Sequence, residues 1–97
     1  MKENTLQNKC IELLKKNRIY YVNIYGSSRT GKGTPDILAC INGKFYAFEL
    51  KVGKNKASDI QLYRLKEIER NGGKGYIIRS ADEIKDILEK EGVLTQC

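Results

Sequence analysis

Residues 35–51 read PDILACINGKFYAFELK, with Asn42-Gly43 between the apolar runs Asp36–Ile41 and Lys44–Lys51. Asn-Gly is the preferred pair for a two-residue type I′ turn, because both residues of that turn adopt a positive φ. The turn type also fixes the register of the two strands that it joins. We therefore predict a β-hairpin in which Ile41 lies opposite Lys44.

That register places two acidic residues opposite each other. Each step away from the turn moves one residue along both strands, so Asp36 lies opposite Glu49. Directly opposed residues have Cβ atoms about 4.5 to 5.5 Å apart, and like charges at that spacing destabilise a sheet. The pair therefore predicts a bound cation, and a hard divalent ion such as Mg²⁺ suits carboxylate, carbonyl and water oxygens. Lys51 lies two residues beyond Glu49 and shares its face.

A purely structural interpretation of these residues stays open. Asp36 could be a turn residue at the start of its strand, and Glu49 with Lys51 could form the solvated face of an amphipathic strand. Strand alternation, however, puts the apolar side chains of Phe45 and Ala47 on the same face as Glu49. Because that face is not uniformly polar, the pattern favours the metal site.

Hydrophobic periodicity and turn residues predict the other elements. In chain order these are a helix over Thr5–Asn17, a strand over Ile19–Tyr25, the hairpin, a loop over Lys54–Ala57, a helix over Ser58–Asn71, a strand over Tyr76–Arg79 and a last helix that starts with a capping box at Ser80-Ala81-Asp82-Glu83. The order α-β-β-β-α-β-α predicts an α/β fold in which helices flank a mixed sheet. We expect one domain over residues 1–97.

The composition limits the chemistry. Without histidine, the chain has no Ser-His-Asp triad and no His-ligated zinc site. The three cysteines, Cys10, Cys40 and Cys97, lack a CxxC spacing, which disfavours both a zinc cluster and a disulfide framework. A metal ion in this chain would therefore be bound by oxygen atoms.

The charge and the polarity indicate partners and compartment. Eighteen Lys and Arg against twelve Asp and Glu give a net charge of +6, which is typical of proteins that bind a polyanion such as nucleic acid. No apolar run approaches the length of a membrane span, and the N-terminal residues are too polar for a signal peptide. We therefore expect a cytoplasmic protein without a membrane partner.

A glycine-rich basic loop over Gly26–Thr34 imitates a phosphate-binding loop. The GxxxxGK[ST] motif needs a hydroxyl residue after the lysine and a helix directly beyond. Here Gly33 follows Lys32, and Pro35 directs the chain into a strand. We therefore expect no nucleotide cofactor. Arg29 and Lys32 are instead candidates for contacts with DNA phosphates, and a mobile solvated loop is the alternative.

Together, these motifs resemble the PD-(D/E)XK nuclease superfamily, in which Pro35-Asp36 and Glu49-Leu50-Lys51 would be the signature residues. The wider pattern is similar to the small VRR-NUC nucleases, which phages often encode as stand-alone domains. That pattern comprises the opening residues 3–7, Ser58-Asp59-Ile60-Gln61, Asn71-Gly72-Gly73 and Arg79-Ser80. The resemblance covers residues 3–90 and implies a restriction-endonuclease-like core with metal-dependent phosphodiester hydrolysis.

The resemblance also implies roles for single residues. Asp36, Glu49 and the carbonyl of Leu50 would bind Mg²⁺, for which Mn²⁺ would substitute, and Lys51 would orient or activate the attacking water. Glu3 would complete the acidic site, because its helical phase lies near that of the apolar residues. Glu12, on the polar side of the same helix, is the second candidate for that role.

Gln61 matches the family's glutamine on the helix after the motif, and its helical phase points inward. A capping box with Ser58 would explain the same residue without catalysis, and the two interpretations remain equally open. Lys54 and Lys56 follow the motif closely and are candidate DNA contacts.

The expected function is a Mg²⁺-dependent DNA endonuclease. The resemblance and the small size suggest a homodimer with two active sites, which would suit a branched substrate such as a Holliday junction. The alternative is a non-catalytic DNA-binding module that retains the nuclease fold. Such a module would bind DNA with a steep salt dependence but would not cleave it.

Overall fold

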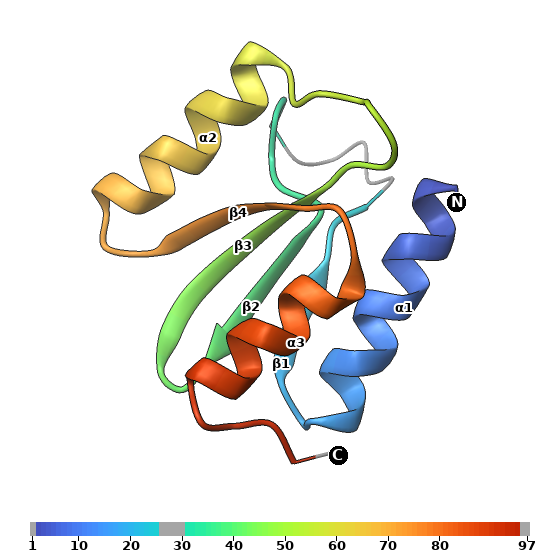
Figure 1. Cartoon of the computed structure of the whole chain (residues 1–97). Helices are drawn as coiled ribbons and strands as arrows, with labels where there is room; N and C mark the ends of the chain where they lie inside the picture. Colours follow the sequence, from blue (N-terminus) through green and yellow to red (C-terminus); the bar gives the residue numbers. More distant parts are fainter. Residues whose placement is uncertain (1, 26–30, 96–97) are drawn as a thin grey trace.

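The computed structural model describes residues 2–25 and 31–95. Its elements follow in the order α1 (Glu3–Lys16), β1 (Tyr20–Asn23), β2 (Ile37–Ile41), β3 (Lys44–Leu50), α2 (Asp59–Arg70), β4 (Lys74–Ile78) and α3 (Ala81–Lys90). The strands form one sheet in the order β1-β2-β3-β4, antiparallel except for the parallel pair β3 and β4 (Figure 1). The predicted element order and the mixed sheet are therefore confirmed.

The β2–β3 hairpin has the predicted register. Ile41 is paired with Lys44, and the pairing continues step by step to Ile37 and Phe48. Asn42 and Gly43 take φ angles of 51° and 77°, as a type I′ turn requires. A glycine suits the second position because L side chains rarely adopt that backbone conformation.

Helices cover the two faces of the sheet unequally. α1 and α3 pack side by side over one face, where their apolar stripes meet the alternate residues of the strands (Figure 1). That core contains Leu6, Cys10, Leu14, Ile37, Ala39, Ile41, Tyr46, Phe48, Leu50, Ile78, Ile84 and Leu88. α2 packs on the other face, over β4 and β3, where its Leu65 meets Gly75. None of the described helices has the length and hydropathy of a membrane span.

Several element ends differ from the prediction. α1 begins at Glu3, two residues before the predicted Thr5, and β4 begins at Lys74 rather than Tyr76. The capping box expected at Ser80 does not form, because the Ser80 side chain makes no hydrogen bond to the backbone of the helix. The Ser80 hydroxyl donates to the Glu83 carboxylate at 3.3 Å. The same carboxylate accepts a hydrogen bond from the backbone N–H of Arg79 rather than from that of Ser80.

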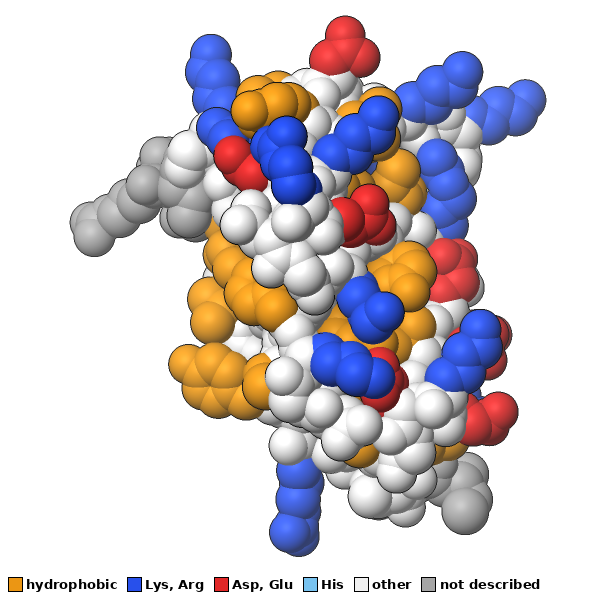
Figure 2. Space-filling view, turned by 90° about the vertical axis from the view of Figure 1, so that its left-hand side faces the viewer, with side chains coloured by type: hydrophobic (Ala, Val, Ile, Leu, Met, Phe, Trp, Pro, Cys, Tyr) orange, Lys and Arg blue, Asp and Glu red, His pale blue; other side chains and the backbone are white. Residues whose placement is uncertain are grey.

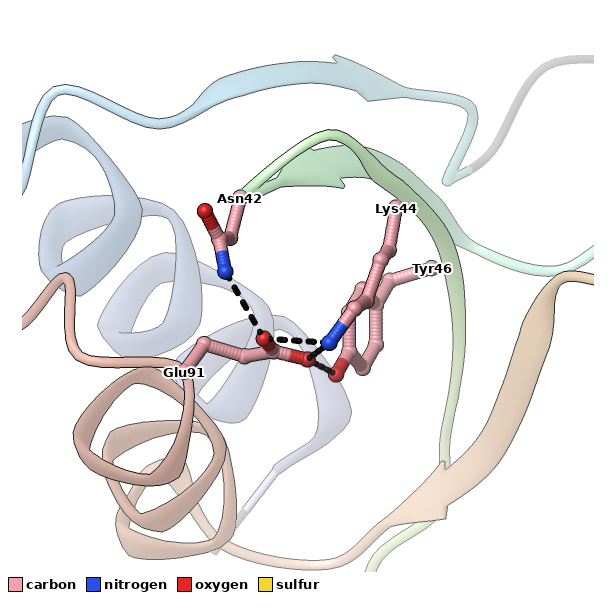
Figure 3. Close-up of polar contacts among 4 residues, drawn as sticks. All are labelled: Asn42, Lys44, Tyr46 and Glu91. Carbon is pink, nitrogen blue, oxygen red and sulfur yellow. Dashed lines mark hydrogen bonds and ion pairs between the residues drawn. The ribbon is translucent and has the colours of Figure 1, made fainter.

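A carboxylate beyond the last helix ties the hairpin to α3. Glu91 accepts hydrogen bonds from Asn42, Lys44 and the Tyr46 hydroxyl, which lie at or near the β2–β3 turn (Figure 3). The bonds from Lys44 and Tyr46 lower the pKa of Glu91 to about 2. The cluster joins segments 45 to 49 residues apart in sequence, so local sequence patterns gave no sign of it.

We expect Glu91→Gln to lower the Tm at neutral pH. Because the pKa of Glu91 is lower in the folded than in the unfolded chain, the ionised carboxylate stabilises the fold at pH values above its unfolded pKa. This contribution is lost as the pH falls toward 2. The difference between wild type and variant should therefore shrink in acid, as measured by thermal melts at several pH values. Glu89→Gln, an exposed acid at the end of α3, is the control and should change Tm little at any pH.

Candidate active site

The candidate site lies where β2 begins and β3 ends, on the face of the sheet that carries α2. Asp36 directly precedes β2, and the hairpin register extended by one residue places it opposite Glu49. The Asp36 carbonyl accepts from the backbone N–H groups of Ile24 and Tyr25 at 2.8 and 3.0 Å. Its side-chain Oδ2 accepts from the Leu50 N–H at 2.9 Å. Backbone and side chain of this aspartate are thus both fixed.

Glu49 is a buried carboxylate, with 2% of its surface exposed. Its Oε2 lies 3.5 Å from the Lys51 Nζ, which is itself mostly buried. Its Oε1 is buried and has no hydrogen-bond partner among the described residues. A buried polar atom without a partner costs on the order of 1 to 3 kcal/mol, so this oxygen indicates a missing ligand.

The raised pKa values of Asp36 and Glu49 also indicate that a positive charge is missing between them. Burial and the neighbouring Asp36 charge raise the pKa of Glu49 to about 7, although Lys51 acts against the shift. Burial likewise raises the pKa of Asp36, although the Leu50 N–H bond opposes the rise. The two carboxylates therefore resist simultaneous ionisation, and one lysine does not compensate for both. Added positive charge at this point would stabilise the ionised pair.

The residues present fit a divalent cation. Asp36 and Glu49 supply carboxylate oxygens from two adjacent strands, and an all-oxygen donor set suits Mg²⁺ or Mn²⁺ better than a softer metal. Across the described residues, no three acidic or cysteine side chains come close enough together to form a larger metal cluster. The remaining ligands of an ion at this pair would be carbonyl oxygen, water or substrate oxygen.

Part of the glycine-rich loop is fixed next to α2. Gly33 has φ 77°, and a Cβ at this position would lie 2.8 Å from the Ile60 carbonyl oxygen. Arg64 of α2 donates its Nε–H to the Lys32 carbonyl at 3.2 Å. Lys32 is therefore held by its backbone while its side chain is exposed. Arg29, the other candidate phosphate contact of this loop, lies outside the described residues.

Arg79 orders the loop that follows the motif, a role that our sequence reasoning missed. It lies directly after β4 and donates from its guanidinium to the Gly53 carbonyl at 3.0 Å. The Lys51 N–H donates to the Ile78 carbonyl at 3.0 Å, so the chain stays attached to β4 beyond the end of β3. Lys54 and Lys56 follow in this loop as exposed side chains.

The structure does not bring Glu3 to the carboxylate pair. Glu3 is the first residue of α1 and is half-buried, but α1 packs on the opposite face of the sheet. No third acid joins Asp36 and Glu49 among the described residues. Glu12, the second candidate, is exposed and pairs with Lys16 at 3.4 Å.

Gln61 forms the capping box of α2. Its Oε1 accepts from the Ser58 N–H at 2.9 Å, and the Ser58 hydroxyl oxygen accepts from the Gln61 N–H at 3.3 Å. This arrangement explains both residues as structural, while a catalytic role of Gln61 remains a prediction. α2 begins beside the Gly33 loop, so the cap also fixes the helix end nearest the site.

Comparisons with known proteins agree with this architecture. No family model matches the sequence, and no curated protein matches it. A solved structure described as a "VRR_NUC domain" is similar to this chain with a TM-score of 0.72 and 19% sequence identity. The match covers 90% of this chain and 94% of that one. The fold expected from the resemblance is thus confirmed: this chain has the α/β, restriction-endonuclease-like fold of a VRR_NUC domain.

Proposed function

We propose that this chain is a metal-dependent DNA endonuclease of the VRR-NUC family. The observation that carries the proposal is the buried Oε1 of Glu49 beside Asp36, which has no hydrogen-bond partner in the part of the chain that the structure describes. Binding of DNA alone does not require two apposed, desolvated carboxylates, which would repel the phosphates. A phosphodiester hydrolase needs such a pair, because carboxylates are the usual protein ligands of catalytic Mg²⁺.

Each residue of the site has a proposed role. Asp36, Glu49 and the Leu50 carbonyl would bind Mg²⁺ or Mn²⁺. When bound, the ion would supply charge stabilisation to the phosphate and the leaving oxygen. Lys51, whose Nζ lies 3.5 Å from Glu49, would orient the water whose oxygen bonds to phosphorus as the bond to the leaving oxygen breaks. Glu3 and Gln61 keep their expected roles only as hypotheses.

The basic side chains support DNA as the substrate. Lys32, Lys54 and Lys56 are exposed on the two loops next to the site. Other Lys and Arg side chains project from several sides of the molecule, so the net charge of +6 is not confined to one patch (Figure 2). We propose that the loop lysines, with Arg29, contact the phosphates on either side of the cleaved bond. Phosphate contacts of this kind position the protein without reading sequence.

We further propose that the chain acts as a homodimer on branched DNA such as a Holliday junction. Two copies related by symmetry would present two sites to two strands of one junction. The alternative, a non-catalytic DNA-binding module, would bind the same substrates with a steep salt dependence but leave them intact.

The direct test is incubation of the purified protein with junction, flap, single-stranded and linear duplex DNA, with Mg²⁺ or Mn²⁺ and with EDTA. We expect metal-dependent cleavage that is strongest on the junction. Asp36→Asn should slow it at least about a hundredfold, because a metal contributes several kcal/mol to such reactions. The exposed acid Glu12 provides the matched control, and Glu12→Gln should cleave like wild type. Intact substrate in every metal would favour the binding module.

A further inference from the structure

A polar groove lies along the outer edge of the sheet, on the face that carries α1. β1 is the edge strand, and a turn over residues 17–19 brings the chain back beside α1 (Figure 1). The groove between α1 and β1 encloses about 470 Å³. The side-chain amides of Gln7, Asn8 and Asn23 border it, together with the ring of Tyr21. Neither carboxylate of the candidate active site lines this groove, which is therefore a separate hollow.

Gln7 is the buried polar side chain of the groove. Only 9% of its surface is exposed, although it borders the hollow. The amide of Asn17, also buried, donates to the Leu13 carbonyl at 2.9 Å. The amide of Gln7, in contrast, has no hydrogen-bond partner within residues 2–25 and 31–95. Because buried polar groups in folded proteins are normally hydrogen-bonded, this amide indicates a ligand that would lie in the groove.

The groups around the groove match the chemistry of a nucleobase. A side-chain amide carries a donor and an acceptor next to each other, as the edges of the bases do. The Asn23 Oδ1 accepts from the Tyr25 N–H at 3.2 Å, which leaves its NH₂ group as a second donor for a ligand. Tyr21 is half-buried, so part of its ring is free for stacking. Unpaired bases are commonly bound in this way, by hydrogen bonds to their edges and by stacking on aromatic rings.

The rim of the groove suits the phosphate of the same nucleotide. Glu12 borders the groove, but its carboxylate is paired with Lys16 at 3.4 Å. Lys15 also borders it, with an exposed side chain that makes no ion pair within the described residues. One positive charge is therefore left for an anionic ligand, and a nucleotide offers such a charge next to its base.

One end of the groove lies close to the candidate active site. Asn23 is paired with Ile37, the residue directly after Asp36, and neighbouring strands are about 4.8 Å apart. The two residues after Asn23 donate their backbone N–H groups to the Asp36 carbonyl at 2.8 and 3.0 Å. A DNA strand at the carboxylate pair could therefore reach the groove around the edge of the sheet.

We propose that the groove binds one unpaired nucleobase of the DNA strand, held by Gln7 and Asn23 and stacked on Tyr21. This inference deepens the proposed function and rests on DNA as its substrate. A base costs least to take out of the stack where it is already unpaired, as at a branch point. The groove would therefore favour branched over linear duplex DNA, in which every base is paired.

Fluorescence anisotropy in EDTA at low salt tests the proposal on the full chain, because DNA then binds without being cleaved. The probes are two DNA junctions with one unpaired nucleotide at the branch point, which either carries its base or is abasic. Stacking and edge contacts should make wild type bind the junction with the base about tenfold more tightly. Gln7→Met keeps the length of the side chain without its amide and should reduce this preference to about threefold or less.

Two further variants complete the design. Asn4→Ala removes an exposed amide of the same helix that does not border the groove, and it should keep the full preference for the base. Asn23→Ala, at an exposed position of β1, should weaken the preference as Gln7→Met does. It tests the groove independently if thermal melts show that Gln7→Met does not fold.

The outcomes separate the groove from the nuclease activity. A wild type that binds neither junction, or both equally, overturns the proposal, whether or not it cleaves DNA when metal is added. An undiminished preference in Asn23→Ala and in folded Gln7→Met also overturns it, because the base would then be bound elsewhere. A preference that is lost in the groove variants but kept in Asn4→Ala supports the groove, even if no DNA is cleaved in any metal.

Discussion

Glu49→Gln is expected to abolish metal-dependent cleavage and, in the same protein, to raise the Tm of the metal-free form at pH 8. The loss of cleavage follows because an amide is a poor ligand for Mg²⁺ in place of a carboxylate. The gain in stability follows from burial. Glu49 is 2% exposed, and its pKa rises from 4.5 to about 7 in the folded protein.

The sign of the stability change comes from the pKa shift. The pKa of Glu49 is higher in the folded than in the unfolded chain, so its protonated form favours folding. This contribution is fully present below the unfolded pKa of 4.5 and is lost as the pH rises through about 7. At pH 8 the wild type therefore buries a charge at a cost on the order of 3 kcal/mol. Glutamine is neutral at every pH and avoids that cost.

Thermal melts in EDTA at pH 8 and pH 5 measure this effect. The Tm of Glu49→Gln should exceed that of wild type at pH 8, and the difference should nearly vanish at pH 5, where wild-type Glu49 is protonated. Glu12→Gln removes an exposed carboxylate and should match wild type at both pH values. A Glu49→Gln protein that melts below wild type at pH 8 would contradict the interpretation that ionised Glu49 is destabilised by its burial beside Asp36.

The hairpin shows how much of this site the sequence predicts. Asn42-Gly43 specifies a turn with two positive φ angles, and that turn alone fixes which residues of β2 and β3 face each other. Because side chains alternate along strands, the same register decides that Asp36 and Glu49 share a face and that Lys51 joins them. Local rules therefore suffice for the part of the site that lies on adjacent strands.

Residues brought in by tertiary packing were not predictable in this way. Helical phase showed correctly that Glu3 lies near the buried stripe of α1, but phase does not say which face of the sheet the helix will cover. Glu91 reaches the hairpin from beyond α3, and Arg79 reaches the loop after β3 from the end of β4. Each contact depends on how distant elements pack, and no spacing within one segment encodes it.

Gln61 illustrates a different limit. The spacing Ser58-x-x-Gln61 fits both a capping box and the glutamine expected from the nuclease family, and the structure shows that its carbonyl oxygen serves the cap. The Ser80 spacing is the same with glutamate in place of glutamine, yet there the serine makes no bond to the helix backbone. One sequence pattern thus gives two local structures, because the carboxylate of Glu83 bonds the Arg79 N–H instead.

Divalent ions should stabilise the folded protein strongly at pH 8 and weakly at pH 5. A ligand at a hundred times its dissociation constant adds about 2.7 kcal/mol to stability, and 1 kcal/mol shifts the Tm of a domain of this size by roughly 4 °C. We therefore expect Mn²⁺ to raise the Tm by about 10 °C at pH 8. At pH 5, protons compete with the ion for Glu49, whose pKa of about 7 leaves it mostly protonated.

Melts with Mn²⁺ and with EDTA check this without any reference to cleavage. The shift should disappear in Asp36→Asn and in Glu49→Gln, since each removes one of the two charged ligands that the hairpin brings together. It should persist in Glu12→Gln, whose carboxylate lies outside the site. An equal shift at both pH values, or an undiminished shift in Asp36→Asn, would place the ion elsewhere on the protein. The buried Oε1 of Glu49 would then need another partner, and the proposed nuclease chemistry would lose its physical basis.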